Sequence, residues 1–212
     1  VVLSVVFSNM FKFDVEYFPV YLLSGQLIFN FFNEATTNAM GAIVMNGPLI
    51  KKIYVPKYMF VLSRIFSSSI NLLASFTAMI FVMLAMRVEL HYTVLLAPIP
   101  LLFIVFFSLG VGLILSAITV KFRDIMHLYS VFVTALMYLT PVIYPMSILP
   151  EWLKKIVLLN PLTNILTMFR NVMINNMLPS ISSILAAVEV AVVMVLGLYV
   201  FYKRQDTFIL DI

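Results

Sequence analysis

Long apolar runs separated by short polar links make up the hydrophobic pattern of this chain. About 20 apolar residues cross a bilayer as a helix, whereas strands of a membrane barrel alternate strictly over about 10 residues. The pattern here is the helical one, with spans predicted at residues 18–42, 58–86, 93–118, 126–140 and 181–202. We therefore predict an all-α integral membrane protein whose residues 1–212 form a single membrane domain.

The first ten residues, VVLSVVFSNM, are apolar but too few to cross a bilayer alone. They do not begin with methionine and have no charged n-region, so they are not typical of a signal peptide. We predict that they are the end of a first span. On this interpretation the complete chain has six spans, and the sequence is truncated at its N-terminus.

Basic residues favour one set of links. Residues 46–57, residues 119–125 and the C-terminal tail contain Lys51, Lys52, Lys57, Lys121, Arg123, Lys203 and Arg204. In the opposite links, the basic residues are diluted by Asp14, Glu16, Glu89 and Glu151. Because Lys and Arg concentrate in cytoplasmic links, we predict that residues 46–57, residues 119–125 and the C-terminus are cytoplasmic.

The link at residues 46–57, NGPLIKKIYVPK, has the pattern of a short amphipathic helix. Asn46 is suited to cap it, Pro48 to its first turn and Pro56 to its end. The predicted apolar face is Leu49, Ile50, Ile53 and Tyr54, with Lys51 and Lys52 beside it. Such a helix rests on lipid headgroups or docks into a groove of a partner. A plain basic loop is the open alternative.

The link TVKFRDI contains Lys121, Arg123 and Asp124. Its basic residues are typical of headgroup contacts, and Asp124 is suited to cap the following helix.

Residues 141–180 do not have the pattern of a simple span. Pro141, Pro145 and Pro150 fall within ten residues, so the preceding helix must stop near Thr140. Pro150 can open one short helix, and the Asn160–Pro161 pair can open a second. We predict two short extracellular helices that enter the outer leaflet without crossing it. A seventh span is disfavoured by Lys154, Lys155, Pro161 and Arg170.

Glu34, Arg64 and Glu189 are ionisable residues within predicted spans. Each costs about 2.5 kcal/mol or more at the bilayer centre, so each should face protein or water. Glu34 and Arg64 lie at similar predicted depths in neighbouring helices, which predicts an ion pair between them. A proton-relay role is the alternative.

Composition supports a membrane protein without catalytic chemistry. The chain is 63% hydrophobic and 10% charged, with a mean hydropathy of +1.11, whereas soluble domains carry about 25% charged residues. The net charge of +4 lies beside the spans and does not indicate nucleic-acid binding. There is no cysteine, no phosphate-binding loop and no carboxylate cluster, and His91 and His127 are isolated. We predict a non-enzyme that binds neither metal nor cofactor.

Five segments occur together in a recognisable order: LLSGQLIFNFF, NGPLIKKIYVP, GLILSAITVKFRDI, TPVIYP with SILPEW, and LNPLT with FR. In this combination the chain resembles the ABC-2-type permeases that export surface polysaccharides such as O-antigen, capsule and teichoic acid. The resemblance implies a fold like that of type V exporters, a homodimer, and two ATP-binding subunits that bind ATP and Mg²⁺. It also implies a multi-pass protein of the bacterial cytoplasmic membrane that moves a lipid-linked glycan or polyol-phosphate polymer.

The resemblance also assigns roles to particular segments. Residues 46–57 would be the coupling helix that docks on the ATPase, Lys121–Asp124 a second contact, and residues 141–180 the re-entrant helices. Aromatic rings and one cation are candidates to line the channel: Phe29, Phe31, Phe32, Phe66, Tyr129, Phe132, Tyr138 and Arg170. Three alternatives remain: an ABC-2 permease for drugs or lipids, an ion-coupled transporter using Glu34 and Glu189, and a membrane scaffold.

Overall fold

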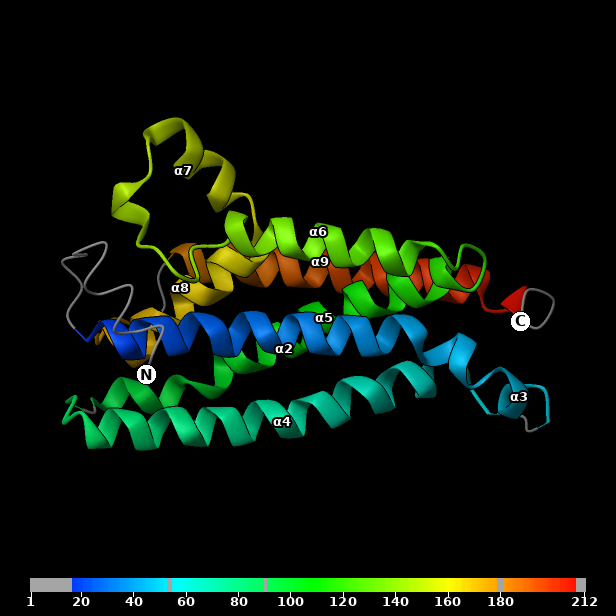
Figure 1. Cartoon of the computed structure of the whole chain (residues 1–212), viewed down its shortest axis with the longest axis horizontal. Helices are drawn as coiled ribbons and strands as arrows, with labels where there is room; N and C mark the ends of the chain where they lie inside the picture. The colour runs from blue at the N-terminus through cyan, green and yellow to red at the C-terminus, as the bar shows by residue number, and fades with distance from the viewer. Residues whose placement is uncertain (1–16, 53–54, 90, 179–180, 209–212) are drawn as a thin grey trace.

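The computed structural model describes residues 17–52, 55–89, 91–178 and 181–208, and these residues form an elongated bundle of helices (Figure 1). The long helices are α2 (Phe18–Met45), α4 (Tyr58–Ala85), α5 (Pro98–Thr119), α6 (Ile125–Leu139) and α9 (Ile181–Arg204). The short ones are α3 (Gly47–Ile50), α7 (Glu151–Leu158), α8 (Pro161–Met173) and the 3₁₀ turns η1 (Tyr92–Leu96) and η2 (Met146–Ile148). The predicted first span lies outside the described residues.

Local sequence signals account for several helix ends. Proline occupies the first turn of α2, α5 and α8, where its missing N–H costs nothing. The Asn160 side chain accepts a hydrogen bond from Leu162 N at 3.1 Å and so caps α8, as predicted. Helix α6 ends at Leu139, and the predicted stop near Thr140 is confirmed.

Three segments of the described chain are long and apolar enough to cross a membrane, judged by length and composition. They are Tyr58–Ala85, Tyr92–Thr119 and Ser183–Arg204. Helix α6 is apolar but has only 15 residues. Helix α2 has 28 residues and does not qualify, although it was predicted as a span. Its length would suffice, at about 1.5 Å per residue, so its composition sets it apart.

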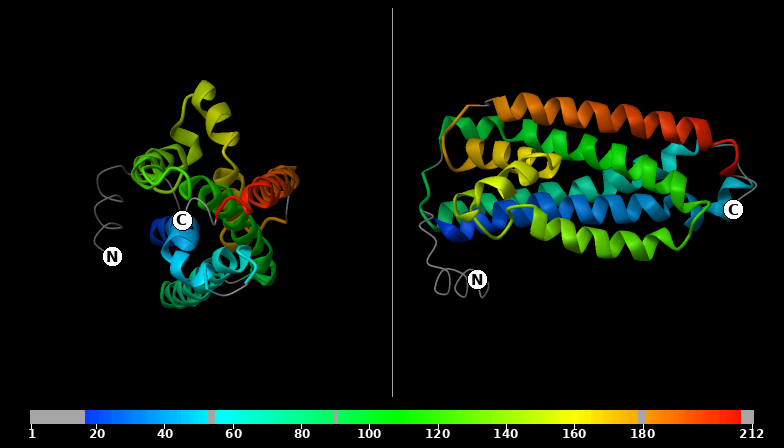
Figure 2. Two further views of the ribbon diagram at one scale, coloured as in Figure 1. Left: turned by 90° about the vertical axis from the view of Figure 1, so that its right-hand side faces the viewer. Right: turned by 90° about the horizontal axis from the view of Figure 1, so that it is seen from above.

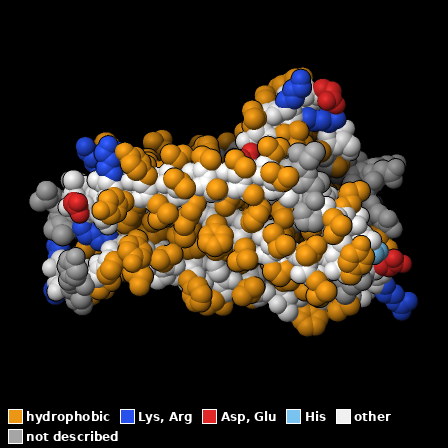
Figure 3. All heavy atoms as spheres, turned by 180° about the vertical axis from the view of Figure 1, so that it is seen from behind, with side chains coloured by type: hydrophobic (Ala, Val, Ile, Leu, Met, Phe, Trp, Pro, Cys, Tyr) orange, Lys and Arg blue, Asp and Glu red, His pale blue; other side chains and the backbone are white. Residues whose placement is uncertain are grey.

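The two ends of the bundle differ in content. Helix α3, the α5–α6 link and the C-terminus lie at one end, while α7, α8 and the α4–α5 link lie at the other (Figures 1 and 2). The links with the most Lys and Arg therefore share an end, as the charge pattern predicts. Charged side chains gather at both ends, and a broad hydrophobic belt separates them on the face drawn in Figure 3.

The core of the bundle is built around α5, which packs against α2, α4 and α9. The backbones of helices α5 and α9 lie close together at Gly110 and Gly197. A Cβ atom added to Gly110 would lie 2.8 Å from Val193 O and 2.9 Å from Met194 N. Small residues allow such backbone contact, which favours helix association where burial from water cannot drive it.

Candidate functional site

A polar stripe runs along α2. Its residues recur at intervals of three or four, which places them on one face of the helix. They are Gln26, Asn30, Asn33, Glu34, Thr37 and Asn38. Asn30, Asn33, Thr37 and Asn38 are exposed in this chain, whereas the opposite face of α2 packs into the core. Thr37 and Asn38 donate to other side chains of this chain. Polar groups without hydrogen-bond partners are costly in an apolar medium, so the remaining groups need water, a polar ligand or another polar protein surface.

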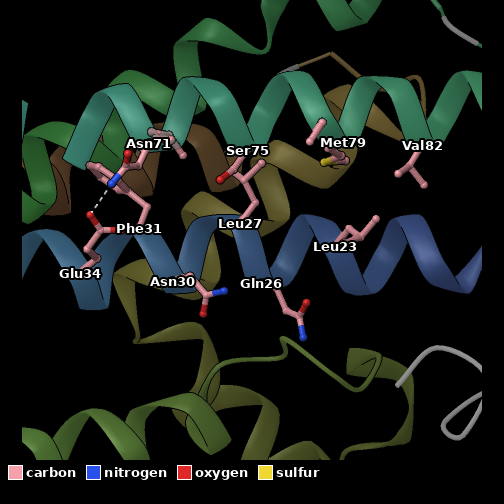
Figure 4. A pocket seen from close by; sticks show the side chains of 12 residues that line it. Leu23, Gln26, Leu27, Asn30, Phe31, Glu34, Asn71, Ser75, Met79 and Val82 are labelled. Atoms are coloured by element: carbon pink, nitrogen blue, oxygen red, sulfur yellow. Dashed lines mark hydrogen bonds between the residues drawn. The ribbon is translucent and has the colours of Figure 1, made fainter. Parts of the chain in front are cut away.

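One groove flanks the stripe between α2 and α4, with a cavity volume of about 280 Å³ (Figure 4). Its α4 wall includes Asn71, Ser75 and Met79. Gln26 and Asn30 extend from α2 on the side away from α4. The stripe therefore continues past this groove towards the other side of α2.

A second groove lies between α2 and α6, with a cavity volume of about 650 Å³. Helix α2 contributes Asn33, Thr37 and Asn38 to its lining, and α6 contributes Ser130 and Thr134. Hydroxyl and amide groups thus line both walls. Together the two grooves provide a hydrogen-bonding surface on both sides of α2.

Glu34 is the residue that the two grooves share. Its Oε1 accepts hydrogen bonds from Asn71 Nδ2 at 2.8 Å and from Ser68 Oγ at 3.1 Å. Asn38 Nδ2 in turn donates to Ser68 Oγ at 3.4 Å. Both described hydrogen bonds to the Glu34 carboxylate are accepted by Oε1. Oε2 can therefore accept hydrogen bonds from a molecule in either groove.

The predicted ion pair between Glu34 and Arg64 does not form, and Arg64 is exposed. The two residues lie at different depths in the structure, because α2 continues to Met45, three residues beyond the predicted end at 42. Glu34 therefore lies 11 residues from the end of α2, whereas Arg64 lies 6 from the start of α4. The difference of five residues is about 7.5 Å along a helix, and Ser68 and Asn71 stand where Arg64 was expected.

The aromatic candidates fall into three groups. Phe31 lines the α2–α4 groove, while Phe29 and Tyr129 line the α2–α6 groove. Tyr129 also donates from its hydroxyl to Thr36 Oγ1 at 2.6 Å, which fixes its position. Phe66, Phe132 and Tyr138 are exposed and lie outside both groove linings. Assigning Phe32 to a channel was wrong, because its ring is buried and stacks on Phe107 at 5.5 Å.

Arg170 was also expected to line the channel, and this prediction is wrong. Its side chain is 6% exposed and lies inside the bundle, on α8. The guanidinium donates to Pro141 O at 2.7 Å, Val142 O at 3.0 Å, Tyr21 O at 3.1 Å and Ser24 Oγ at 3.1 Å. It also lies 3.5 Å from the Tyr21 ring centroid. The residue holds α8, α2 and the segment after α6 together.

Two more polar residues of α8 are buried. Thr163 and Asn164 are almost inaccessible, and Asn164 Nδ2 donates to Glu189 Oε2 of α9 at 2.9 Å. Helix α8 therefore packs among α2, α5 and α9 rather than presenting a polar face outward. Helix α7, by contrast, projects from the bundle and exposes Trp152 (Figure 1).

Helix α3 begins the predicted coupling segment, but it is shorter than the prediction. It covers four residues, and Asn46 does not cap it, because its Nδ2 donates back to Ala42 O at 2.7 Å. Leu49, Lys51 and Lys52 are exposed. Ile50 is buried in the core of this chain, so its predicted availability to a partner is wrong. Ile53 and Tyr54 lie outside the described residues.

The second predicted contact lies at the same end of the bundle (Figure 1). Lys121, Arg123 and Asp124 are all exposed, as is Phe122 between them. Asp124 occupies the N-cap position of α6, yet its side chain makes no capping bond. With Leu49, Lys51 and Lys52, this end presents a basic surface that contains two exposed apolar side chains.

The sequence interpretation missed most of the polar stripe. The signal was present as the three- and four-residue spacing of amides and hydroxyls within an otherwise apolar helix. No group of three or more potential metal ligands occurs within the described ranges.

A helical bundle with membrane-length segments and a polar, grooved face is typical of membrane transport proteins. The sequence profile of the ABC-2 type transporter family matches residues 1–174, so the chain belongs to that family. It is a transport component that is not itself catalytic, and membership implies an ATP-binding partner subunit.

Similar proteins include two named O-antigen export system permease protein RfbA. One, from Myxococcus xanthus, is 27% identical over 95% of this chain and 79% of its own length. Another, from Klebsiella pneumoniae, is 26% identical over 96% of this chain and 79% of its own length.

Proposed function

We propose that this chain is the membrane subunit of an ATP-driven exporter that moves a lipid-linked surface polysaccharide or teichoic-acid-type polymer across the bacterial cytoplasmic membrane. The observation that carries the proposal is the polar stripe on α2 with a groove on each side. A sugar polymer offers many hydroxyl groups, and the stripe offers amides, hydroxyls and a carboxylate to pair with them. The names of the O-antigen relatives support the same substrate class.

In the proposed assembly, two copies of the chain pair with two ATP-binding subunits, which supply the ATP and Mg²⁺ sites. The C-terminus lies in the cytoplasm, and the exposed surface of Leu49, Lys51, Lys52 and the α5–α6 link contacts the ATPase. Basic side chains there suit an acidic partner surface, and Leu49 supplies an apolar contact. Nucleotide-driven movement of the ATPases would displace α3 and rock the two protomers, which opens a path along α2.

Family membership favours ATP as the energy source over an ion gradient. An ABC-2 permease for drugs or lipids shares the fold. An apolar drug would not satisfy the exposed amides of α2, and this favours the polysaccharide.

The test is to purify the chain with its ATP-binding subunit and measure ATPase activity and export of lipid-linked glycan. We expect the two proteins to co-purify and the glycan to stimulate hydrolysis. Leu49→Asp should reduce co-purification or export at least tenfold, because it places a charge in an apolar contact. Leu159→Asp is the matched control, since Leu159 is also an exposed leucine and lies between α7 and α8 at the opposite end. Absence of an associated ATPase, or equal effects of the two variants, contradicts the proposal.

A further inference from the structure

The charges of the two grooves distinguish between the polymers that the proposed function allows. Two of these polymer classes differ sharply in charge: neutral glycans carry none, whereas polyol-phosphate chains carry one negative charge per repeat. The linings of both grooves contain a single ionisable carboxylate, Glu34. No Lys, Arg or His is among the described residues that line either groove.

We propose that the grooves of α2 select an uncharged glycan and disfavour polyol-phosphate polymers, with Glu34 as the selecting residue. This inference rests on the proposed function and narrows its substrate class. It assigns to Glu34 a role in specificity rather than in ion pairing or proton transfer.

Hydrogen-bonding capacity supports a neutral glycan. A carboxylate only accepts hydrogen bonds, and sugar hydroxyls donate them readily. Oε1 of Glu34 is held by Asn71 and Ser68, so the orientation of the carboxylate is fixed before a ligand arrives. Oε2 remains as an acceptor. Asn30 lines one groove with Glu34 and Asn33 lines the other, and their amides can both donate to and accept from hydroxyls. The surface thus matches a chain of hydroxyl groups.

Electrostatics opposes a phosphate chain at the same place. Proteins that bind phosphate use Arg, Lys or several backbone N–H groups, which supply positive charge. Between unit charges about 8 Å apart, Coulomb repulsion lowers affinity about twofold in water and about thirtyfold at an effective dielectric constant of 20. Each protomer of the proposed dimer brings its own Glu34, and a polymer would meet successive repulsions as it passed.

Arg64 is the basic residue of α4, and its positive charge does not offset the negative charge of Glu34. It is exposed and lines neither groove. Glu34 makes no ion pair within the described part of the chain. Its charge is therefore available to a polymer in either groove.

The experiment compares two probes with the same number of repeat units and the same uncharged fluorophore, maltoheptaose and a seven-unit oligo(glycerol phosphate). Binding to the complex of permease and ATPase in lipid nanodiscs is followed by fluorescence anisotropy up to millimolar probe. The wild type should bind maltoheptaose more tightly. Glu34→Gln keeps an oxygen that can accept from Asn71 and Ser68, and it should shift the ratio of affinities towards the phosphate probe by about two- to thirtyfold. The shift should shrink at high salt.

Glu189→Gln is the matched control, because Glu189 also accepts from an asparagine side chain but lines neither groove. It should leave the ratio of affinities unchanged. The proposed selectivity is wrong if the wild type binds the phosphate probe more tightly, or if neither variant changes the ratio of the two affinities. Either result leaves the proposed function standing. If neither probe binds, the polysaccharide path itself is wrong, and the inference fails with it.

Discussion

Replacing Arg170 by methionine should destabilise the end of the bundle where α8 meets α2. The guanidinium supplies the only hydrogen bonds that the described residues donate to Pro141 O and Val142 O. Methionine can fill much of the volume but cannot donate a hydrogen bond. The substitution therefore leaves two carbonyls without a donor in the interior.

The size of the effect follows from these contacts. Each unsatisfied buried carbonyl costs about 1–3 kcal/mol, and loss of the contact with the Tyr21 ring adds about 1 kcal/mol. Relief from burying a charge without a carboxylate partner offsets part of this cost. We expect a net loss of about 2–4 kcal/mol in the free energy of unfolding. Arg170→Lys should be intermediate, since a single ammonium cannot match four acceptors arranged around a planar fork.

Tryptophan fluorescence is suited to the measurement. The chain has one tryptophan, Trp152 of α7, which follows the segment that Arg170 holds. Denaturant unfolding of the purified protein in detergent, followed at this residue, gives the change in free energy. Arg64→Met is the matched control, because Arg64 is exposed and its loss should change stability by less than about 0.5 kcal/mol. Equal stability of the Arg170 and Arg64 variants would refute the reasoning.

Two further predictions concern packing. Gly110→Ala should destabilise by about 1–3 kcal/mol, because its Cβ would meet the α9 backbone; Gly41→Ala is the control, since there the Cβ would meet mainly the flexible Met45 side chain. Unfolding in detergent compares them, and equal losses contradict the close contact. Lys57→Met should speed proteolysis of the C-terminal segment several-fold, because Lys57 donates to Gln205 O and lies 5.8 Å from the Phe208 ring centroid. Lys52→Met, at an exposed position, should not, and equal cleavage rates would show that Lys57 does not hold this segment.

Local signals explain what the sequence could predict. The end of α6 and the start of α8 depend on Pro141, Asn160 and Pro161, whose effects act within one turn of the chain. The distribution of Lys and Arg between the links can also be interpreted without knowing how the helices pack. These parts of the fold could therefore be predicted from the sequence alone.

Contacts between helices were harder to predict from the sequence, because they depend on where each helix ends and how it is rotated about its axis. The predicted end of α2 was three residues too early, so Arg64 was expected to be the partner of Glu34. In the structure the partners are Ser68 and Asn71. Arg170 has helical spacing that suits an outward polar face, yet the surrounding helices enclose it. A buried arginine needs several acceptors, and those here come from segments more than 25 residues away.

The position of α2 relates the proposed ATPase contact to the polar stripe. Helix α3 follows α2 with only Asn46 between them, and the Asn46 side chain is bonded back to Ala42 O. Ile50 of α3 is anchored in the core. A partner that displaces α3 would therefore act directly on α2 rather than on a loose loop. Because α2 carries the stripe and forms one wall of each groove, such a displacement would change the width of both grooves together. The same helix can thus receive the movement and present the surface proposed to contact the polymer.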